Sequence, residues 1–476
     1  MSQFPPPPQF PPEREHRERE EQPKLQFRQH VSNTVRKSGN PNTFLNELEA
    51  ARDPGNQEDS LQHCQAEEDL KSAKCLGPNP LLLGYRCPYC WQTMNRRLKS
   101  TSKLIDRTRR KLSLGLNETT DEDEKEWEFV PIPTLKLLTT WTDMVDGLMC
   151  NLYYTARTIY GAPPCKFALC VCGSLARTEA CPWSDIDAFI LLETRNQANR
   201  KYFQMASAYV ESHLRYAGNC EGSPAGLSFC CGGLNPMNAD MVQTPERMVQ
   251  LSQTWKRMGN HEADVSVNSR FVYGNRNLHV RFLQLLAEQE RRTVSEEDRQ
   301  RAALATLRQL VERPGLPDRD SLRVDIKEEL YRKVQAIGRE LAKYYGLEEM
   351  STQGQIHALH QSDHMSKEVA DYFTGTLASV SRLRISSHLK AMGENHTYHI
   401  QHPEEEERAA PGFLSTEKQV GTIEQIINRI QVLLNMTKTF IQEKERSRSL
   451  LHPFKTNPFK TGKITDYQVE RFQFRR

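Results

Sequence analysis

Short apolar runs and longer stretches with helical periodicity succeed one another in the middle of the chain. The runs over 166–172 (KFALCVC) and 186–192 (IDAFILL) are short, apolar and β-compatible, so they predict two buried strands. Residues 131–161 and 197–218 carry apolar side chains at helical spacing, which predicts one long helix before the strands and another after them. The order of strand, turn, strand and helix indicates an α+β domain.

Helical periodicity dominates from Leu278 almost to the end of the chain. Four segments predict helices of a bundle, over 278–292, 325–347, 374–393 and 423–445. We therefore expect the α+β domain to cover 131–290 and an all-α helical domain to cover 291–446.

The two ends of the chain differ in composition from its middle. Residues 1–60 combine a proline run and dense mixed charge with few aliphatic residues, so burial cannot offset the entropy of ordering and we expect a disordered arm. Residues 61–130 contain several cysteines followed by an acidic connector. The basic tail over 447–476 alternates aromatic residues with Lys and Arg, a pattern that fits docking on RNA and packing back onto the bundle equally well.

Charge and hydropathy exclude several kinds of partner. The net charge of +3 is small against 64 basic and 61 acidic groups, so charge gives no reason to propose a nucleic-acid or membrane surface. The amino terminus lacks the basic start and apolar run of a secretory signal, and no stretch approaches the roughly 20 apolar residues of a membrane helix. We expect a cytoplasmic protein without a membrane partner, and export by a non-classical route stays open.

Twelve cysteines are scattered along the chain, several of them inside apolar runs, which indicates reduced thiols rather than a disulfide framework. The CPYC sequence gives Cys87 and Cys90 the spacing of a zinc-ligand pair, with His63, Cys64 and Cys75 upstream. Because Cys64 and Cys75 do not form a second close pair, we favour unpaired thiols over a zinc site.

The residues that indicate chemistry lie between the two predicted strands. Gly173 and Ser174 directly follow the first strand, where a tight turn can bring backbone N–H groups and a hydroxyl against phosphate oxygens. Asp185 and Asp187 stand two apart at the start of the second strand, so both carboxylates lie on one face, close enough to share divalent cations. This arrangement suits nucleotidyl transfer, in which carboxylates hold the metal ions that activate the attacking oxygen and neutralise the triphosphate.

The segment over 173–192, GSLARTEACPWSDIDAFILL, resembles the signature of the nucleotidyltransferase superfamily, in particular of the PII-protein uridylyltransferase type. The similarity continues through 230–236 and 269–286 into the helical segments. It implies a small mixed-sheet domain of the polymerase-β type followed by the helical domain. It also implies Mg²⁺ or Mn²⁺, a nucleoside triphosphate as substrate, and transfer of UMP or AMP to an acceptor hydroxyl, on a protein, with release of pyrophosphate.

Further residues obtain roles from their place in or near this motif. Arg177 is a candidate phosphate contact, and Glu179 would orient Arg177 or the metal shell. Ser184 would cap the turn or touch phosphate. Lys327 falls where relatives carry a lysine, and its ammonium would neutralise triphosphate, although a solvated lysine beside Glu328 explains it as well.

The third metal-binding acid of the family does not identify itself in the sequence. Asp240 is the first candidate, so the predicted catalytic and metal-binding set is Asp185, Asp187 and Asp240, with Asp264 as an alternative. Asn268 stands where relatives often have an acid. A degenerate module that binds nucleotide or protein without turnover therefore remains the alternative, and the nucleotide, the acceptor and the oligomeric state stay open.

Overall fold

The computed structural model describes residues 102–114, 132–216, 227–230, 233–258, 266, 268–391, 394–400, 413–414, 417–449, 457–467 and 472–474. The predicted arm over 1–60 and the cysteines Cys64, Cys75, Cys87 and Cys90 lie outside these residues. None of the helices that are described combines the length and the apolar character needed to cross a lipid bilayer.

The first domain is built on a four-stranded mixed sheet. Its strands are β1 (Phe167–Val171), β2 (Ala188–Leu192), β3 (Val242–Gln243) and β4 (Arg270–Gly274), in the order β3-β2-β1-β4. β1 runs antiparallel to β2 and β4, whereas β3 is parallel to β2. The end of β1 and the starts of the other three strands therefore meet at one edge of the sheet, and both predicted strands are confirmed.

Helices cover both faces of this sheet, because its central strands are apolar on both sides. The covering helices are α6 (Ile132–Tyr160) and α8 (Gln197–Tyr216) on one face, and α9 (Pro245–Met258) and α11 (Arg276–Thr293) on the other. Leu169 and Ile190 pack in the core beneath α6 and α8, and Cys170 and Phe189 pack in the opposite core with Phe282 of α11. The alternation expected of a strand thus separates two apolar layers.

A helix over 102–114 belongs to the first of these cores. Its Leu104, Ile105 and Leu112 are buried with the side chains of α6 and α8. The sequence placed these residues within the cysteine-containing segment and acidic connector over 61–130, outside the predicted domain. The packed unit around the sheet therefore includes residues well before position 131.

The second domain is mostly helical. Its larger elements are α12 (Glu296–Glu312), the π-helix η2 (Ile326–Tyr331), α13 (Arg332–Tyr345), α14 (Thr352–Gln361), α15 (Lys367–Ala391) and α16 (Glu417–Ser449). It also holds a sheet of three short strands that the sequence did not predict, β5 (Arg323–Asp325), β6 (Thr397–His399) and β7 (Phe413–Leu414). The predicted fold class, an α+β domain followed by a helical one, is confirmed with that addition.

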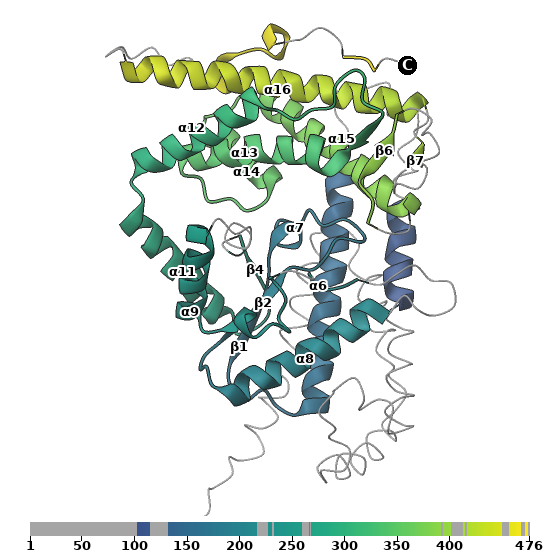
Figure 1. Ribbon diagram of the computed structural model, residues 1–476, viewed down its shortest axis with the longest axis vertical. Coiled ribbons are helices and arrows are strands. Elements are labelled where there is room, and N and C mark those ends of the chain that lie inside the picture. The colour runs from purple at the N-terminus through teal and green to yellow at the C-terminus, as the bar shows by residue number, and fades with distance from the viewer. Residues whose placement is uncertain are drawn as a thin grey trace, which may run out of the picture.

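The long helix α6 joins the two domains. Leu135 and Leu138 in its first turns belong to the core of the helical domain, while Trp141 and the residues after it belong to the core beside the sheet. Figure 1 shows the helical domain stacked on the end of the sheet where the short helix α7 (Gly173–Ala176) lies, with α16 across its outer side. The motif between the first two strands therefore faces the second domain.

The described parts of the C-terminal tail pack against this helical domain. Phe459, Phe472 and Phe474 are buried in its core. The backbone N–H of Phe472 donates to the Asn428 side chain (2.7 Å), and that of Phe474 donates to Glu424 (2.9 Å), both on α16. Of the two interpretations of the tail, these contacts favour packing back onto the bundle, because buried rings offer no face to a base.

Candidate active site

A sharp turn after β1 brings the start of α7 beside the start of β2. Gly173 has a φ of 59°, a left-handed conformation that glycine adopts at no steric cost. The backbone N–H of Cys172 donates to the carbonyl oxygen of Asp187 (2.8 Å), and that of Ala176 donates to the carbonyl of Cys172 (3.1 Å). The Gly173 and Ser174 turn is therefore fixed next to the segment that carries the two aspartates.

Arg270 on β4 holds the other end of this turn. Its guanidinium donates to the carbonyl oxygens of Leu175 (3.1 Å) and Ala176 (3.3 Å) and forms two contacts with the buried carboxylate of Asp146 on α6, at 2.5 and 3.1 Å. The Leu175 carbonyl also accepts from the backbone N–H of Thr178 (3.2 Å), so Arg270 adds a side-chain donor to the end of this short helix. Sequence reasoning missed this residue, which lies far from the motif along the chain.

The aspartates flank a buried residue at the start of β2. Ile186 is 1% exposed and packs in the core beneath α6 and α8, so the period of an extended chain directs Asp185 and Asp187 away from that core. Asp185 is exposed and Asp187 is half-buried. The Ser228 hydroxyl donates to Oδ1 of Asp185 (3.2 Å), and the Ser228 backbone lies alongside because the Ile186 N–H donates to its carbonyl (2.9 Å).

Negative charge is concentrated around the two aspartates. Partial desolvation of the Asp185 carboxyl group is the main reason why its pKa is raised, and the negative charge of Glu394 is the second. The positive charge of Lys327 lowers this pKa. The pKa of the Cys172 thiol is well above its usual value, mainly because the thiol is buried and secondly because of the negative charge of Asp187. Carboxylates crowded in this way are costly without a cation, so the set of oxygen ligands fits Mg²⁺.

Lys327 reaches this cluster from the helical domain. It lies in the first turn of η2, where the Asp325 carboxylate accepts from the backbone N–H groups of Lys327 and Glu328 (2.9 Å each) and so caps the π-helix. Its ammonium lies 3.4 Å from a carboxylate oxygen of Glu394. The charge of Lys327 lowers the pKa of Asp185, so a lysine of the second domain acts electrostatically on an aspartate of the first.

Glu179 forms a buried junction between the two domains. Its carboxylate accepts from Nε of Arg177 (2.9 Å), from the hydroxyl of Tyr331 on η2, and from the backbone N–H of Thr352 on α14 (2.7 Å). The Glu179 side chain is 6% exposed and that of Arg177 is 19% exposed. Glu179 thus orients Arg177, and the pair lies where the helical domain meets the turn.

Ser184 closes the turn that leads into the first aspartate. Its hydroxyl oxygen accepts from the backbone N–H of Cys181 (3.1 Å), and its own N–H donates to the Cys181 carbonyl (3.0 Å). The helix over 102–114 supports this turn, because Arg109 donates to the Pro182 carbonyl (3.1 Å) and stacks 3.7 Å from the centre of the Trp183 ring. Sequence reasoning gave Arg109 no role.

The first candidate for a third ligand, Asp240, lies at the same edge of the sheet. It is exposed in the 3-10 helix η1 (Ala239–Met241), directly before β3, which pairs with β2. Asn268, which stands where relatives often have an acid, lies two residues before β4, whose first residue Arg270 pairs with Val171 at the end of β1. Asp264 lies outside the described residues.

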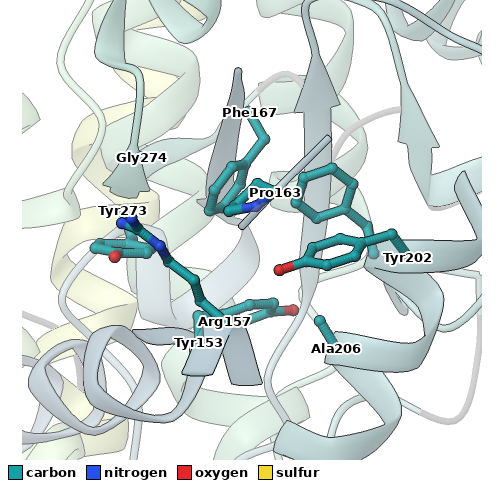
Figure 2. Close-up of a pocket in the computed structure, with 9 residues that line it drawn as sticks. Tyr153, Arg157, Pro163, Phe167, Tyr202, Ala206, Tyr273 and Gly274 are labelled. Carbon is teal, nitrogen blue, oxygen red and sulfur yellow. The ribbon is translucent and has the colours of Figure 1, made fainter. Parts of the chain in front are cut away.

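A cavity of about 110 Å³ lies at the opposite edge of the sheet, at the start of β1 and the end of β4. Its lining includes Arg157 and the rings of Tyr153, Phe167, Tyr202 and Tyr273 (Figure 2). Pockets that enclose drug-sized ligands measure roughly 300 to 1,000 Å³, so this cavity is too small for a nucleoside triphosphate. It also lies away from the carboxylates and is not the site described above.

Comparison with protein families agrees with this geometry. Residues 132–262 match the model described as "Putative nucleotidyltransferase DUF294", and residues 288–408 match "Putative nucleotidyltransferase substrate binding domain". No curated protein matches the chain. The first match includes α6, the turn at Gly173 and both aspartates, and the second includes Lys327 and most of the helical domain. The chain therefore carries a DUF294 nucleotidyltransferase domain followed by the substrate-binding domain of that family.

Proposed function

We propose that this protein is a magnesium-dependent nucleotidyltransferase that moves a nucleoside monophosphate from a triphosphate to an acceptor hydroxyl. One observation carries the proposal. The charge of Lys327 in the substrate-binding domain acts on the carboxyl group of Asp185, at the edge of the sheet where the Gly173 turn and Asp187 also lie. A cation-binding pair, a turn suited to phosphate and a lysine are the groups that transfer of a nucleotide needs.

Each group has a role in this proposal. Asp185, Asp187 and a third acid, Asp240, would hold divalent cations, which supply charge neutralisation of the triphosphate and of the departing pyrophosphate. The Gly173 and Ser174 turn would contact phosphate oxygens through backbone N–H groups and the serine hydroxyl.

The lysine and the turn residues complete the site. Lys327 would leave its ion pair with Glu394 to neutralise charge on the triphosphate. Ser184 holds the approach to the aspartates, and Arg177 and Glu179 keep the helical domain seated on the turn. Substitution of Ser184, Arg177 or Glu179 would misplace the reacting atoms, whereas no reacting group would be removed.

The reaction is an in-line displacement at the α-phosphorus. A bond forms between the acceptor oxygen and the α-phosphorus, the bond from that phosphorus to the bridging oxygen of pyrophosphate breaks, and the hydroxyl proton passes to a carboxylate of the site or to water. Following the resemblance to the PII-protein uridylyltransferase type, we propose UMP or AMP as the transferred group and a protein side chain as the acceptor.

Transfer of label tests this function directly. The full chain is incubated with magnesium, a cell lysate and each of the four ribonucleoside triphosphates labelled at the α-phosphate. The double variant Asp185→Asn, Asp187→Asn serves as the inactive form. Asp371→Asn serves as the matched control, because Asp371 pairs with Lys367 on the surface at the other end of α15 from the site.

We expect label in protein with the wild type and the Asp371→Asn control, and a loss of at least roughly a thousandfold in the double variant. Equal labelling by the double variant would show that the aspartates are not the site.

A binding module without turnover is the second candidate, and Asn268 favours it. An amide stands where the resemblance leads one to expect an acid, two residues before the start of β4. Two results together would support this candidate. The chain would bind nucleotide in a way that depends on Asp185 and Asp187, and no lysate fraction would give transfer or release of pyrophosphate. Transfer restored or increased by Asn268→Asp would show that the missing acid limits an otherwise complete site.

A further inference from the structure

A second cluster of ligand-type side chains lies in the substrate-binding domain. It consists of His388 near the end of α15 and of Glu394 and His396 in the segment that leads into β6. Nε2 of His388 lies 3.3 Å from Nδ1 of His396, and Nε2 of His396 lies 3.0 Å from a carboxylate oxygen of Glu394. Ligand atoms of all three residues lie within 4.8 Å of one another.

The backbone holds this cluster in place. Ser387 donates its hydroxyl to the Asn395 carbonyl (2.5 Å), which ties the segment to the end of α15. Ile326 donates its N–H to the His396 carbonyl (2.8 Å), and β6 pairs with β5 immediately afterwards. The two histidines therefore come from two different elements that are fixed to each other, as a preorganised site requires.

The three side chains differ in burial. His388 is fully buried, whereas the side chains of His396 and Glu394 are 13% and 38% exposed. The protein therefore encloses one side of the cluster, and Glu394 lies on the side that solvent can reach. Neutral imidazoles and an ionised carboxylate are the forms that coordinate a cation.

The spacing also fits an ion. Two nitrogens at zinc-ligand distance from one tetrahedral ion lie about 3.4 Å apart, close to the separation of the facing nitrogens of His388 and His396. Two imidazoles and one carboxylate are a ligand set that zinc uses in sites with an open fourth position. We propose that these three side chains bind one zinc ion, at a site separate from the paired aspartates. Nε2 of His388 and Nδ1 of His396 would supply the nitrogens, and the Glu394 carboxylate would turn from Nε2 of His396 to the ion.

Occupancy would alter the neighbouring active site, a consequence that rests on the proposed function. Glu394 is the ion-pair partner of Lys327 and one of the charges that raise the pKa of Asp185. A cation on Glu394 competes with the Lys327 ammonium and frees it for the triphosphate. The binding of zinc itself requires neither nucleotide nor acceptor, so its test is independent of the transfer reaction.

The test measures zinc on the full chain. The background is Cys87→Ser, Cys90→Ser, which removes the CPYC pair as a competing ligand set. The protein is stripped with a chelator and dialysed against buffered Zn²⁺. Bound metal is counted by elemental analysis, and affinity is measured by competition with a chromogenic chelator. Co²⁺ is added in a parallel sample, because its absorption distinguishes nitrogen and oxygen ligands from thiolates.

Three substitutions make the result specific. His396→Gln and Glu394→Gln alter side chains that are 13% and 38% exposed, so both variants should fold, as circular dichroism would verify. His357→Gln, at an exposed histidine of α14, is the matched control. We expect one zinc per chain, an affinity weakened roughly 10- to 100-fold or more in the first two variants, and no change in the control.

Three outcomes would overturn the proposal. The first is a chain that binds no zinc at micromolar free metal. The second is a zinc affinity that His396→Gln and Glu394→Gln leave unchanged, since the metal would then lie elsewhere. The third is a Co²⁺ spectrum that shows thiolate ligands, which would place the metal on cysteines.

Discussion

The buried carboxylate of Glu179 should be among the most sensitive positions in the chain. Removal of this side chain in Glu179→Ala leaves three donors without their acceptor, namely the Arg177 guanidinium, the Tyr331 hydroxyl and the Thr352 N–H. The pKa of Tyr331 is raised, mainly because the ring is buried and secondly because of the negative charge of Glu179. Its hydroxyl therefore remains a donor at any ordinary pH. The loss therefore concerns both a charge pair and neutral hydrogen bonds.

The magnitude follows from this count. Breaking a buried ion pair by removing one partner costs about 3–5 kcal/mol, because the remaining charge stays buried without compensation. The ion pair of Lys166 and Glu193 provides the comparison, since those side chains are 63% and 44% exposed. Exposed pairs contribute little to stability because water screens the two charges, so Glu193→Ala should leave the urea midpoint nearly unchanged.

Urea unfolding measures the difference in stability between Glu179→Ala and Glu193→Ala. Tryptophan fluorescence and circular dichroism monitor the same transition. Of the five tryptophans, Trp141, Trp183 and Trp255 are the ones that the structure describes, and all three lie in the sheet domain, so fluorescence reports mainly on that domain. Circular dichroism reports mainly on the helices. We expect Glu179→Ala to lower the midpoint strongly and to separate the two transitions, since the junction between the domains is lost. A Glu179→Ala midpoint equal to that of Glu193→Ala would refute this account of the junction.

Three further changes test individual features. Gly274→Ala would place a Cβ 2.3 Å from the backbone oxygen of Phe167 at a φ of 99°, so we expect a loss of roughly 2–5 kcal/mol in urea unfolding; a loss below about 0.5 kcal/mol would contradict that geometry. Asp146→Asn leaves the Arg270 charge uncompensated and should cost roughly 3 kcal/mol by the same measurement, whereas an unchanged midpoint would show that the pair contributes nothing. Burial lowers the pKa of His279 to about 4, so the unfolded chain binds its proton first and stability falls as pH decreases from about 6.5 towards 4, by roughly 3 kcal/mol over that window. His279→Gln should lose correspondingly less stability than the wild type across the same pH range. Parallel curves of stability against pH for the two proteins would show that His279 does not cause the loss.

The local parts of this fold could be predicted from the sequence. The strands β1 and β2 are short apolar runs between turn residues, and α6, α8 and α16 have clear helical spacing, so periodicity located them. The motif over 173–192 could also be identified, because all of its residues lie within one short stretch of the chain. The strands β5, β6 and β7 have only two or three residues, which is too short for alternation to be detected.

The contacts that complete the site could not be predicted in this way. Glu179 meets Tyr331 across 152 positions of the chain, and Arg270 meets Asp146 across 124. Such pairs depend on how the domains pack, and a single sequence carries no local signal for them. The helix over 102–114 was hidden because its neighbours over 115–131 are acidic and polar, which made the whole segment resemble a connector.

Diffraction from a crystal with manganese and a non-hydrolysable triphosphate analogue would show where the metal ions and the nucleotide bind. Anomalous scattering locates Mn²⁺ without reference to activity. We predict manganese between the carboxylates of Asp185 and Asp187, with the analogue's phosphates over the Gly173 turn. Carboxylates that point to opposite faces of the strand, or a triphosphate bound elsewhere while this edge remains empty, would contradict it.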